Sequence, residues 1–173
     1  MKLIIATRRV SSPSWLLAAL AFSLAGIASA EELPSACPIL SSQQVSTILG
    51  RDIPSGGVAA SRKGKTATCK FKGESQFAEV RVSEFPTEAA AIDSYRETLA
   101  NFSREAARSE PLHGVGTESR LLLRGALTIV ARFGVHIVVV TTDGSRSAVV
   151  GLARAVGAKV APAGSPDANP EAP

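Results

Sequence analysis

The 173-residue sequence predicts an α+β domain built on one antiparallel sheet. Three observations favour this fold class. Short segments alternate apolar and polar residues, as half-buried strands do. Short turns connect these segments, which suits antiparallel pairing, and helices with one apolar stripe separate the strand groups. The expected order is α-ββ-α-βββ-α, with about five strands and with the helices mainly on one face of the sheet.

A short helix begins the predicted domain. Ser41 and Gln44 have the spacing of a capping box, in which each side chain bonds the other residue's backbone N–H. Val45 begins the apolar stripe of this helix, and Gly50 stands where a left-handed C-cap belongs. Residues 51–65 contain one proline and three glycines, and we expect a loop there.

A hairpin follows the loop. Residues 66–72 alternate, with Ala67, Cys69 and Phe71 on one face and polar side chains on the other. A second strand is expected from the alternation of Ala78, Val80 and Val82, and the short turn at residues 73–76 predicts antiparallel pairing.

The longest predicted helix begins at residues 86–88. Its apolar side chains recur at steps of three and four and form one continuous stripe: Ile92, Tyr95, Leu99, Phe102 and Ala106. After a loop at residues 111–117, three strands are expected at about 119–124, 126–133 and 135–142, with glycines in the turns between them.

The last of these strands is apolar on both faces, which predicts a central or covered position. In the strand before it, one face carries Leu127, Ile129, Ala131 and Phe133. A final helix is predicted after the cap at residues 143–145. The sheet face away from the helices is expected to be wet, because it carries Lys70, Lys72, Glu79, Arg81, Thr128 and Arg132.

The first thirty residues have the pattern of a secretory signal peptide. Arg8 and Arg9 precede an apolar run of about 13 residues, and the small residues that signal peptidase prefers end at Ala30. A membrane span needs about 20 residues, so we expect cleavage after Ala30 and no transmembrane anchor afterwards, with an uncleaved anchor and a twin-arginine export route as alternatives. The predicted organisation is a signal peptide at 1–30, a single α+β domain at 31–160 and a disordered Pro/Ala-rich tail at 161–173.

Composition argues against a nucleic-acid partner. The 19 basic side chains fall to 16 once Lys2, Arg8 and Arg9 leave with the leader, against 15 acidic ones. A general nucleic-acid binder needs a large positive field, which this balance does not supply.

Cys37 and Cys69 are the two cysteines of the chain. In an oxidising compartment such a pair predicts a disulfide, which would close a loop of about 33 residues and stabilise the fold by roughly 3.5–4 kcal/mol. A redox or metal role is the weaker alternative, because there is no Cys-x-x-Cys and zinc would need two further ligands.

No catalytic motif stands out. His113 and His136 lack metal-ligand spacing, the common hydrolase signatures are absent, and Gly114-Val115-Gly116 is followed by a strand rather than a helix, so we interpret it as a turn. We therefore predict no enzymatic activity, no metal site and no cofactor.

One charge cluster is a candidate binding site. Five cations lie within eleven residues and no acidic residue interrupts them: Arg62, Lys63, Lys65, Lys70 and Lys72. They could form a patch that binds an anion or an acidic partner. The alternative is an ordinary solvated loop and strand face.

The segment from Cys37-Pro38-Ile39-Leu40 to the Leu49-Gly50 helix end, the Cys69-Lys70-Phe71 triplet and Gly114-Val115-Gly116 together resemble small secreted domains of actinobacterial envelope lipoproteins. The plan is also similar to the extracellular sensor domain of a mycobacterial Ser/Thr kinase. This resemblance implies an exported domain that binds or senses, and it supplies no catalytic residue. The lipoprotein members carry a lipid-attachment cysteine at the leader, which this chain lacks.

We accordingly expect an exported, non-enzymatic binding or sensor-like module of the cell envelope, periplasmic or secreted. Its expected partner is an envelope protein, lipid or glycan, and the expected state is a monomer or weak homodimer. One alternative is a periplasmic inhibitor or immunity protein of a secreted hydrolase, and another is an enzyme of unfamiliar type.

Overall fold

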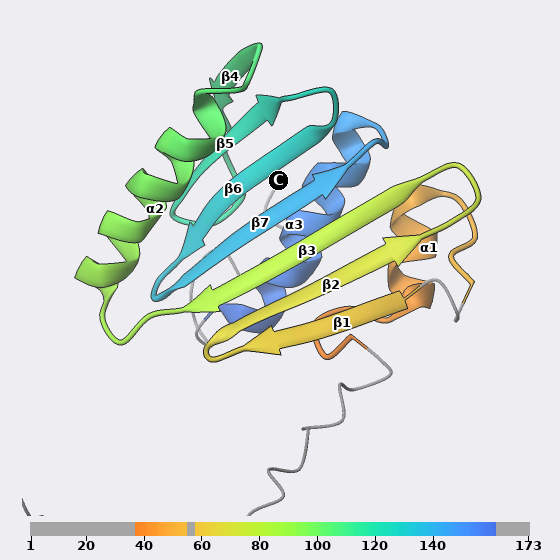
Figure 1. Ribbon diagram of the computed structural model, residues 1–173, viewed down its shortest axis with the longest axis horizontal. Helices are drawn as coiled ribbons and strands as arrows, with labels where there is room; N and C mark the ends of the chain where they lie inside the picture. The colour runs from red at the N-terminus through yellow and green to blue at the C-terminus, as the bar shows by residue number, and fades with distance from the viewer. Residues whose placement is uncertain (1–36, 55–57, 162–173) are drawn as a thin grey trace, which may run out of the picture. The chain divides into compact units, whose positions relative to one another are not determined.

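The structure, a computed structural model, describes residues 37–54 and 58–161 of the chain. Within this part, the elements follow the order α-βββ-α-ββββ-α (Figure 1). The helices are α1 (Ser42–Leu49), α2 (Glu88–Ser103) and α3 (Arg146–Val160). The strands are β1 (Val58–Lys63), β2 (Thr66–Lys72), β3 (Phe77–Glu84), β4 (Arg108–Pro111), β5 (Glu118–Leu123), β6 (Leu127–Phe133) and β7 (His136–Thr142).

All of these strands form one antiparallel sheet in the order β1-β2-β3-β7-β6-β5-β4. The predicted class is confirmed, but the expected number of about five strands is wrong, because the sheet of the described residues has seven. The two strands that the sequence did not indicate are the edges, β1 and β4. β1 lies inside the segment expected to be a loop. Neither β1 nor β4 has an alternation of apolar and polar residues, because edge strands commonly carry small or charged residues that prevent aggregation.

The main hydrophobic core lies between the sheet and the helices α1 and α3, which cover what we call the inner face. The inward side chains of β2, β3, β6 and β7 meet the apolar stripe of α3, where Val149, Leu152 and Val156 are fully buried. The predicted shared face of β6 is confirmed, and β7 occupies the central position that its two apolar faces indicated.

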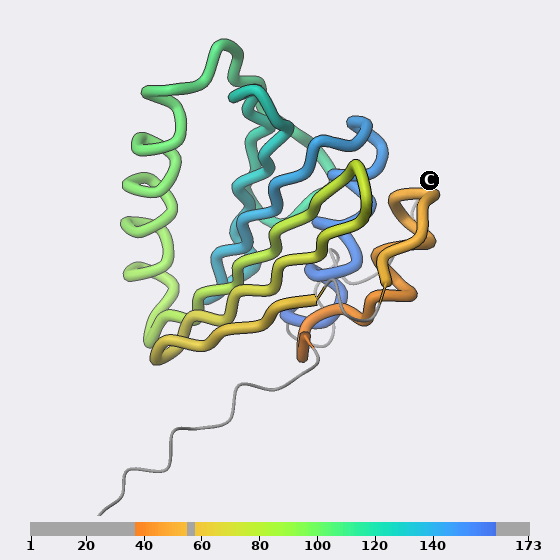
Figure 2. The backbone as a smooth tube through the Cα atoms, turned by 45° about the vertical axis from the view of Figure 1, so that its right-hand side comes forward, coloured from red at the N-terminus to blue at the C-terminus, as the bar shows by residue number. Residues whose placement is uncertain are grey.

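The helix α2 packs on the opposite, outer face of the sheet, over β5, β6 and β7 (Figure 2). Tyr95 is buried there against Leu122, Val130, Ile137 and Val139, which form a second core. The expectation that the helices lie mainly on one face is therefore corrected: the longest helix covers the other face. β7 needed apolar residues on both faces because each face carries a helix.

Thr128 and Arg132, which were expected on a wet face, are buried on the outer face. The Arg132 guanidinium donates to Glu88 Oε1 at 2.7 Å and to the carbonyl oxygen of Gly134 at 3.2 Å. It also lies 3.5 Å from Glu118 Oε1. The two carboxylates, which reach solvent, compensate the positive charge of the buried Arg132 in place of water. The contact with Glu88 also attaches the first turn of α2 to the sheet.

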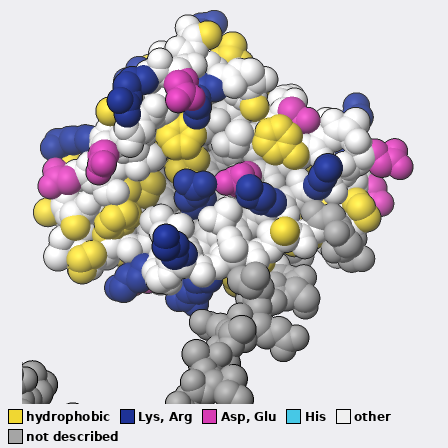
Figure 3. All heavy atoms as spheres, viewed as in Figure 1, with side chains coloured by type: hydrophobic (Ala, Val, Ile, Leu, Met, Phe, Trp, Pro, Cys, Tyr) yellow, Lys and Arg dark blue, Asp and Glu magenta, His cyan; other side chains and the backbone are white. Residues whose placement is uncertain are grey.

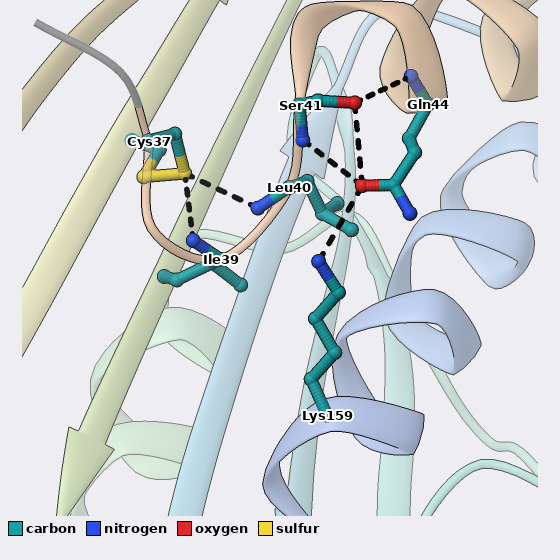
Figure 4. Close-up of a disulfide and its surroundings, with 7 residues drawn as sticks. Cys37, Ile39, Leu40, Ser41, Gln44 and Lys159 are labelled. Carbon is teal, nitrogen blue, oxygen red and sulfur yellow. Dashed lines mark hydrogen bonds between the residues drawn. A yellow bond between two sulfur atoms is a disulfide. The ribbon is translucent and has the colours of Figure 1, made fainter.

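The N-terminal segment is fixed by a disulfide and a capping box, as the sequence predicted (Figure 4). Cys37 is bonded to the buried Cys69 of β2, and Cys37 Sγ accepts hydrogen bonds from two backbone N–H groups, at 3.3 Å from Ile39 and 3.4 Å from Leu40. The Gln44 side chain completes the box with Ser41. The C-cap Gly50 has φ 68°, the left-handed conformation expected at this position.

Phe133 packs tightly against α3. Its side chain is buried, and a Cβ added at Gly157 would overlap its ring. Gly157 therefore allows the close approach of helix and sheet at this point. No helix of the described residues has both the length and the apolarity to cross a membrane. The predicted signal peptide, its cleavage site and the tail beyond Ala161 lie outside the described residues.

Candidate functional site: a groove beside the hairpin of β2 and β3

The outer face of the sheet has a covered half and an open half. α2 covers β5, β6 and β7, whereas the polar side chains of β1, β2 and β3 on the same face remain exposed or half-exposed. Figure 3 looks onto this face and shows Lys and Arg side chains spread over the open half, with an acidic side chain among them. We call this region the open half of the outer face.

The structure separates the five clustered cations. Lys65 lies in the β1–β2 turn, 3.8 Å from Glu84 Oε1, and Lys63 ends β1 beside it. Arg62 pairs with the inward-facing Ala67, and its Nε donates to the carbonyl oxygen of Gly64.

Lys70 and Lys72 lie at the other end of the hairpin of β2 and β3. Lys70 Nζ is 3.4 Å from Glu79 Oε2, and Glu79 also contacts Arg81 at 3.2 Å. The length of β2 places Lys72 about 20 Å from the cations near the β1–β2 turn. The five residues are therefore arranged as two groups at opposite ends of β2.

The second group borders a cavity of about 450 Å³, lined by residues 70–79 and Asp143. We call this cavity the hairpin groove. Lys72 and Phe77 are directly opposite each other in the β2–β3 register, at the turn end of the hairpin. Phe77 is 39 % exposed, one of two large apolar side chains exposed to this degree among the described residues. The groove thus combines an aromatic surface with two lysines.

The backbone at Phe77 is held on both sides. Its N–H donates to Asp143 Oδ1 at 3.0 Å, and its carbonyl oxygen accepts from Thr142 Oγ1 at 2.7 Å. The turn is closed by a 2.8 Å bond from the N–H of Gly73 to the carbonyl oxygen of Gln76. The end of β7 therefore fixes the position of Phe77 without burying its ring, which is a preorganised arrangement for binding.

The charges of the groove are only partly compensated. Among the described residues, Glu79 is paired with Lys70 and Arg81, and Asp143 accepts from a backbone N–H, whereas Lys72 and the turn residue Glu74 make no ion pair. Lys72 is exposed on its strand. It is thus a positive charge, free of any described carboxylate partner, beside an exposed aromatic ring.

Two other cavities lack the combination of an exposed aromatic ring and an unpaired lysine. A cavity of about 420 Å³ shares the turn at residues 73–76 with the hairpin groove and is lined on its other side by Arg51, Asp52 and Pro54, without an exposed aromatic ring. A smaller one of about 130 Å³ lies beside β4, where the carboxylate of Glu110 contacts both Arg108 and Arg146 and compensates their charge in part.

The described residues contain no cluster of three or more His, Cys, Asp or Glu side chains suited to holding a metal ion. His113 is exposed in its loop, and His136 begins β7 with its Nδ1 buried and without a hydrogen-bond partner in the described part. Burial raises the pKa of the Tyr95 hydroxyl, Glu118 raises it further, and Arg120 and Arg132 lower it. Tyr95 lies beneath α2, on the covered half, and is not part of the hairpin groove.

The sequence analysis singled out Lys70 and Lys72 but not Phe77 or Asp143. A signal for Phe77 was present, because it continues the outward register of Glu79 and Arg81, and an aromatic residue on the polar side of a strand is unusual. Asp143 was interpreted as part of a helix cap. Its bond to Phe77 joins residues 66 apart in the sequence, so only the fold could show it.

No family model, curated protein or solved structure matches this chain. The candidate site therefore depends on the geometry of the chain itself.

Proposed function

We propose that this protein is an exported, non-enzymatic binding module of the cell envelope, and that the hairpin groove is its binding surface. The observation that carries the proposal is the pairing of exposed Phe77 with Lys72, which has no described ion partner, at a place where Thr142 and Asp143 hydrogen-bond the Phe77 backbone. A solvated strand face has no need of an exposed aromatic ring, whereas a binding surface gains affinity from one.

The scaffold supports this function. The disulfide, the capping box and the two cores stabilise the domain on both sides of the sheet, while the groove remains open. The disulfide also suits a protein that works in an oxidising compartment, as an exported protein would.

Selective obstruction of the groove tests the proposal. Glu74→Cys would place a bulky uncharged polyethylene glycol maleimide at the rim of the groove, and Asp93→Cys would place the same group on the exposed surface of α2. Each substitution removes one carboxylate, so the two labelled proteins differ in the position of the obstruction rather than in charge. Both would be incubated with purified envelope glycans, lipid vesicles and envelope proteins.

We expect at least one class to bind the unlabelled protein, to be lost on labelling at position 74 and to be retained on labelling at position 93. The bound molecule should be recovered chemically unchanged. Binding that survives the label at position 74, failure of every class to bind, or conversion of the bound molecule into a product would each contradict the proposal.

A further inference from the structure

We infer that the ligand of the hairpin groove is an extended segment of a partner polypeptide, in which an apolar residue and two acidic residues share one side of the segment. This inference rests on the proposed function and adds the chemical class of the ligand. Three features of the groove support it: the spacing of its lysines, the exposed aromatic ring between polar groups, and the mixed sign of its charges.

The spacing of the cations matches that of an extended peptide. Lys70 and Lys72 are two residues apart on β2 and project from the same face, so their Cα atoms are about 7 Å apart. Acidic residues at positions i and i+2 of an extended peptide share one side and have the same spacing. Such a peptide would place one carboxylate at Lys72, which has no described ion partner, and the other at Lys70.

The aromatic ring requires an apolar group on the ligand. Phe77 is 39 % exposed and lines the groove beside Lys72. A cavity of about 450 Å³ accommodates one large apolar side chain against this ring together with part of the backbone on either side. A polyphosphate or another uniformly charged polymer has no apolar group for this position.

The carboxylates of the groove argue against an extended anionic surface. Glu74, Glu79 and Asp143 line the same cavity as the two lysines. An anionic membrane or a polyanion would bring negative charge close to all three and be repelled. A polypeptide brings carboxylates only at chosen positions and carries backbone N–H groups that can lie near Glu74 or Glu79. The mixture of charges therefore favours a peptide.

The chain offers a matched control for each contact. Lys63 is an exposed lysine on β1, the strand next to β2, and about 20 Å from Lys72, which exceeds the screening length of about 8 Å at physiological salt. Leu123 is the other large exposed apolar side chain, 42 % exposed and outside the groove.

The experiment measures binding of the intact disulfide-bonded protein to a library of eight-residue peptides. Each peptide carries two acidic residues at positions i and i+2 and Leu or Phe at i−2 or i+4, so that all three side chains share one side of the extended chain. Each has a partner peptide in which Asn or Gln replaces both acids. Long-chain polyphosphate and vesicles of phosphatidylglycerol are assayed in parallel.

We expect acidic peptides to bind saturably and their partner peptides without acids not to bind. Binding should be about tenfold weaker in Lys72→Glu and about fivefold weaker in Phe77→Ala. It should change by less than about twofold in the control variants Lys63→Glu and Leu123→Ala. All four substitutions are at exposed positions, and circular dichroism should show the same fold in each.

Failure of every acidic peptide to bind, or binding that is insensitive to Lys72 and Phe77, would overturn the inference. Binding of polyphosphate or of vesicles that is lost in Lys72→Glu, without peptide binding, would also overturn it but would leave the groove as the binding surface. Failure of the label at position 74 to block any ligand would instead overturn the proposed function.

Discussion

Removal of the disulfide is the perturbation whose effect the structure defines most fully. Replacing Cys37 and Cys69 together by alanine takes away a cross-link between residues 32 apart in the sequence. It also removes the Sγ atom that accepts hydrogen bonds from two backbone N–H groups just before α1. No free cysteine is created, and Cys69 is replaced by a smaller apolar residue inside the core.

The magnitude follows from loop entropy. Closing a loop of this length lowers the entropy of the unfolded chain by about 12.5 cal/mol/K, which corresponds to about 3.7 kcal/mol at 25 °C. The two weak bonds to sulfur and the lost packing around Cys69 add about 1 kcal/mol. We expect the double variant to lose about 4–5 kcal/mol of its free energy of unfolding.

Urea denaturation followed by circular dichroism measures this loss. The wild-type protein with its disulfide reduced is the control, since it loses the cross-link but keeps both sulfur atoms. It should lose about 3.7 kcal/mol. Both uncross-linked forms should show a larger dependence of the free energy on urea, because their unfolded chains expose more surface. A loss below about 1 kcal/mol in both would refute the reasoning, since the bridge would then not be constraining the unfolded chain.

Two further predictions concern the two faces of the sheet. Gly157→Ala should destabilise the protein by about 1–3 kcal/mol in urea denaturation, because the added methyl group overlaps the buried ring of Phe133. Gly151→Ala on the same helix comes no closer than 3.0 Å to Ile48 Cγ2, which a small shift of Ile48 relieves, and it should cost clearly less. Equal losses in the two variants would contradict the overlap. Burial raises the pKa of Tyr95 in the folded protein, so the unfolded chain loses the phenolic proton at a lower pH than the folded protein does. The contribution of neutral Tyr95 to the free energy of unfolding is therefore complete below pH 10.0 and is lost as the pH rises through the folded pKa. The absorbance of the chain's single tyrosine should therefore show a midpoint above 10.0, and Tyr95→Phe should lose less stability at alkaline pH; a midpoint at or below 10.0 would contradict this.

Local patterns predicted the elements whose residues carry strong periodic signals. The capping box of Ser41 and Gln44, the alternation of β2 and β3 and the final helix after its cap each depend on neighbours within a few residues, and each is present in the structure. The disulfide was predictable because the chain offers one pairing of cysteines. The edge strands β1 and β4 were not predictable in this way, because an edge is formed by pairing with a neighbour rather than by burial of its own side chains.

The candidate site was likewise predictable only in those parts that depend on residues close together in the sequence. The sequence determined the fold class, the disulfide and the presence of lysines in the β2 region, because propensity, periodicity and cysteine count are properties of the chain itself. Only the tertiary structure decided that α2 covers the far half of the outer face, that Arg132 is buried beneath it, and that Lys72 and Phe77 meet Asp143 in one groove. Those relations join residues far apart in the sequence, and they depend on which face of the sheet each helix covers, a choice made by packing of the whole domain.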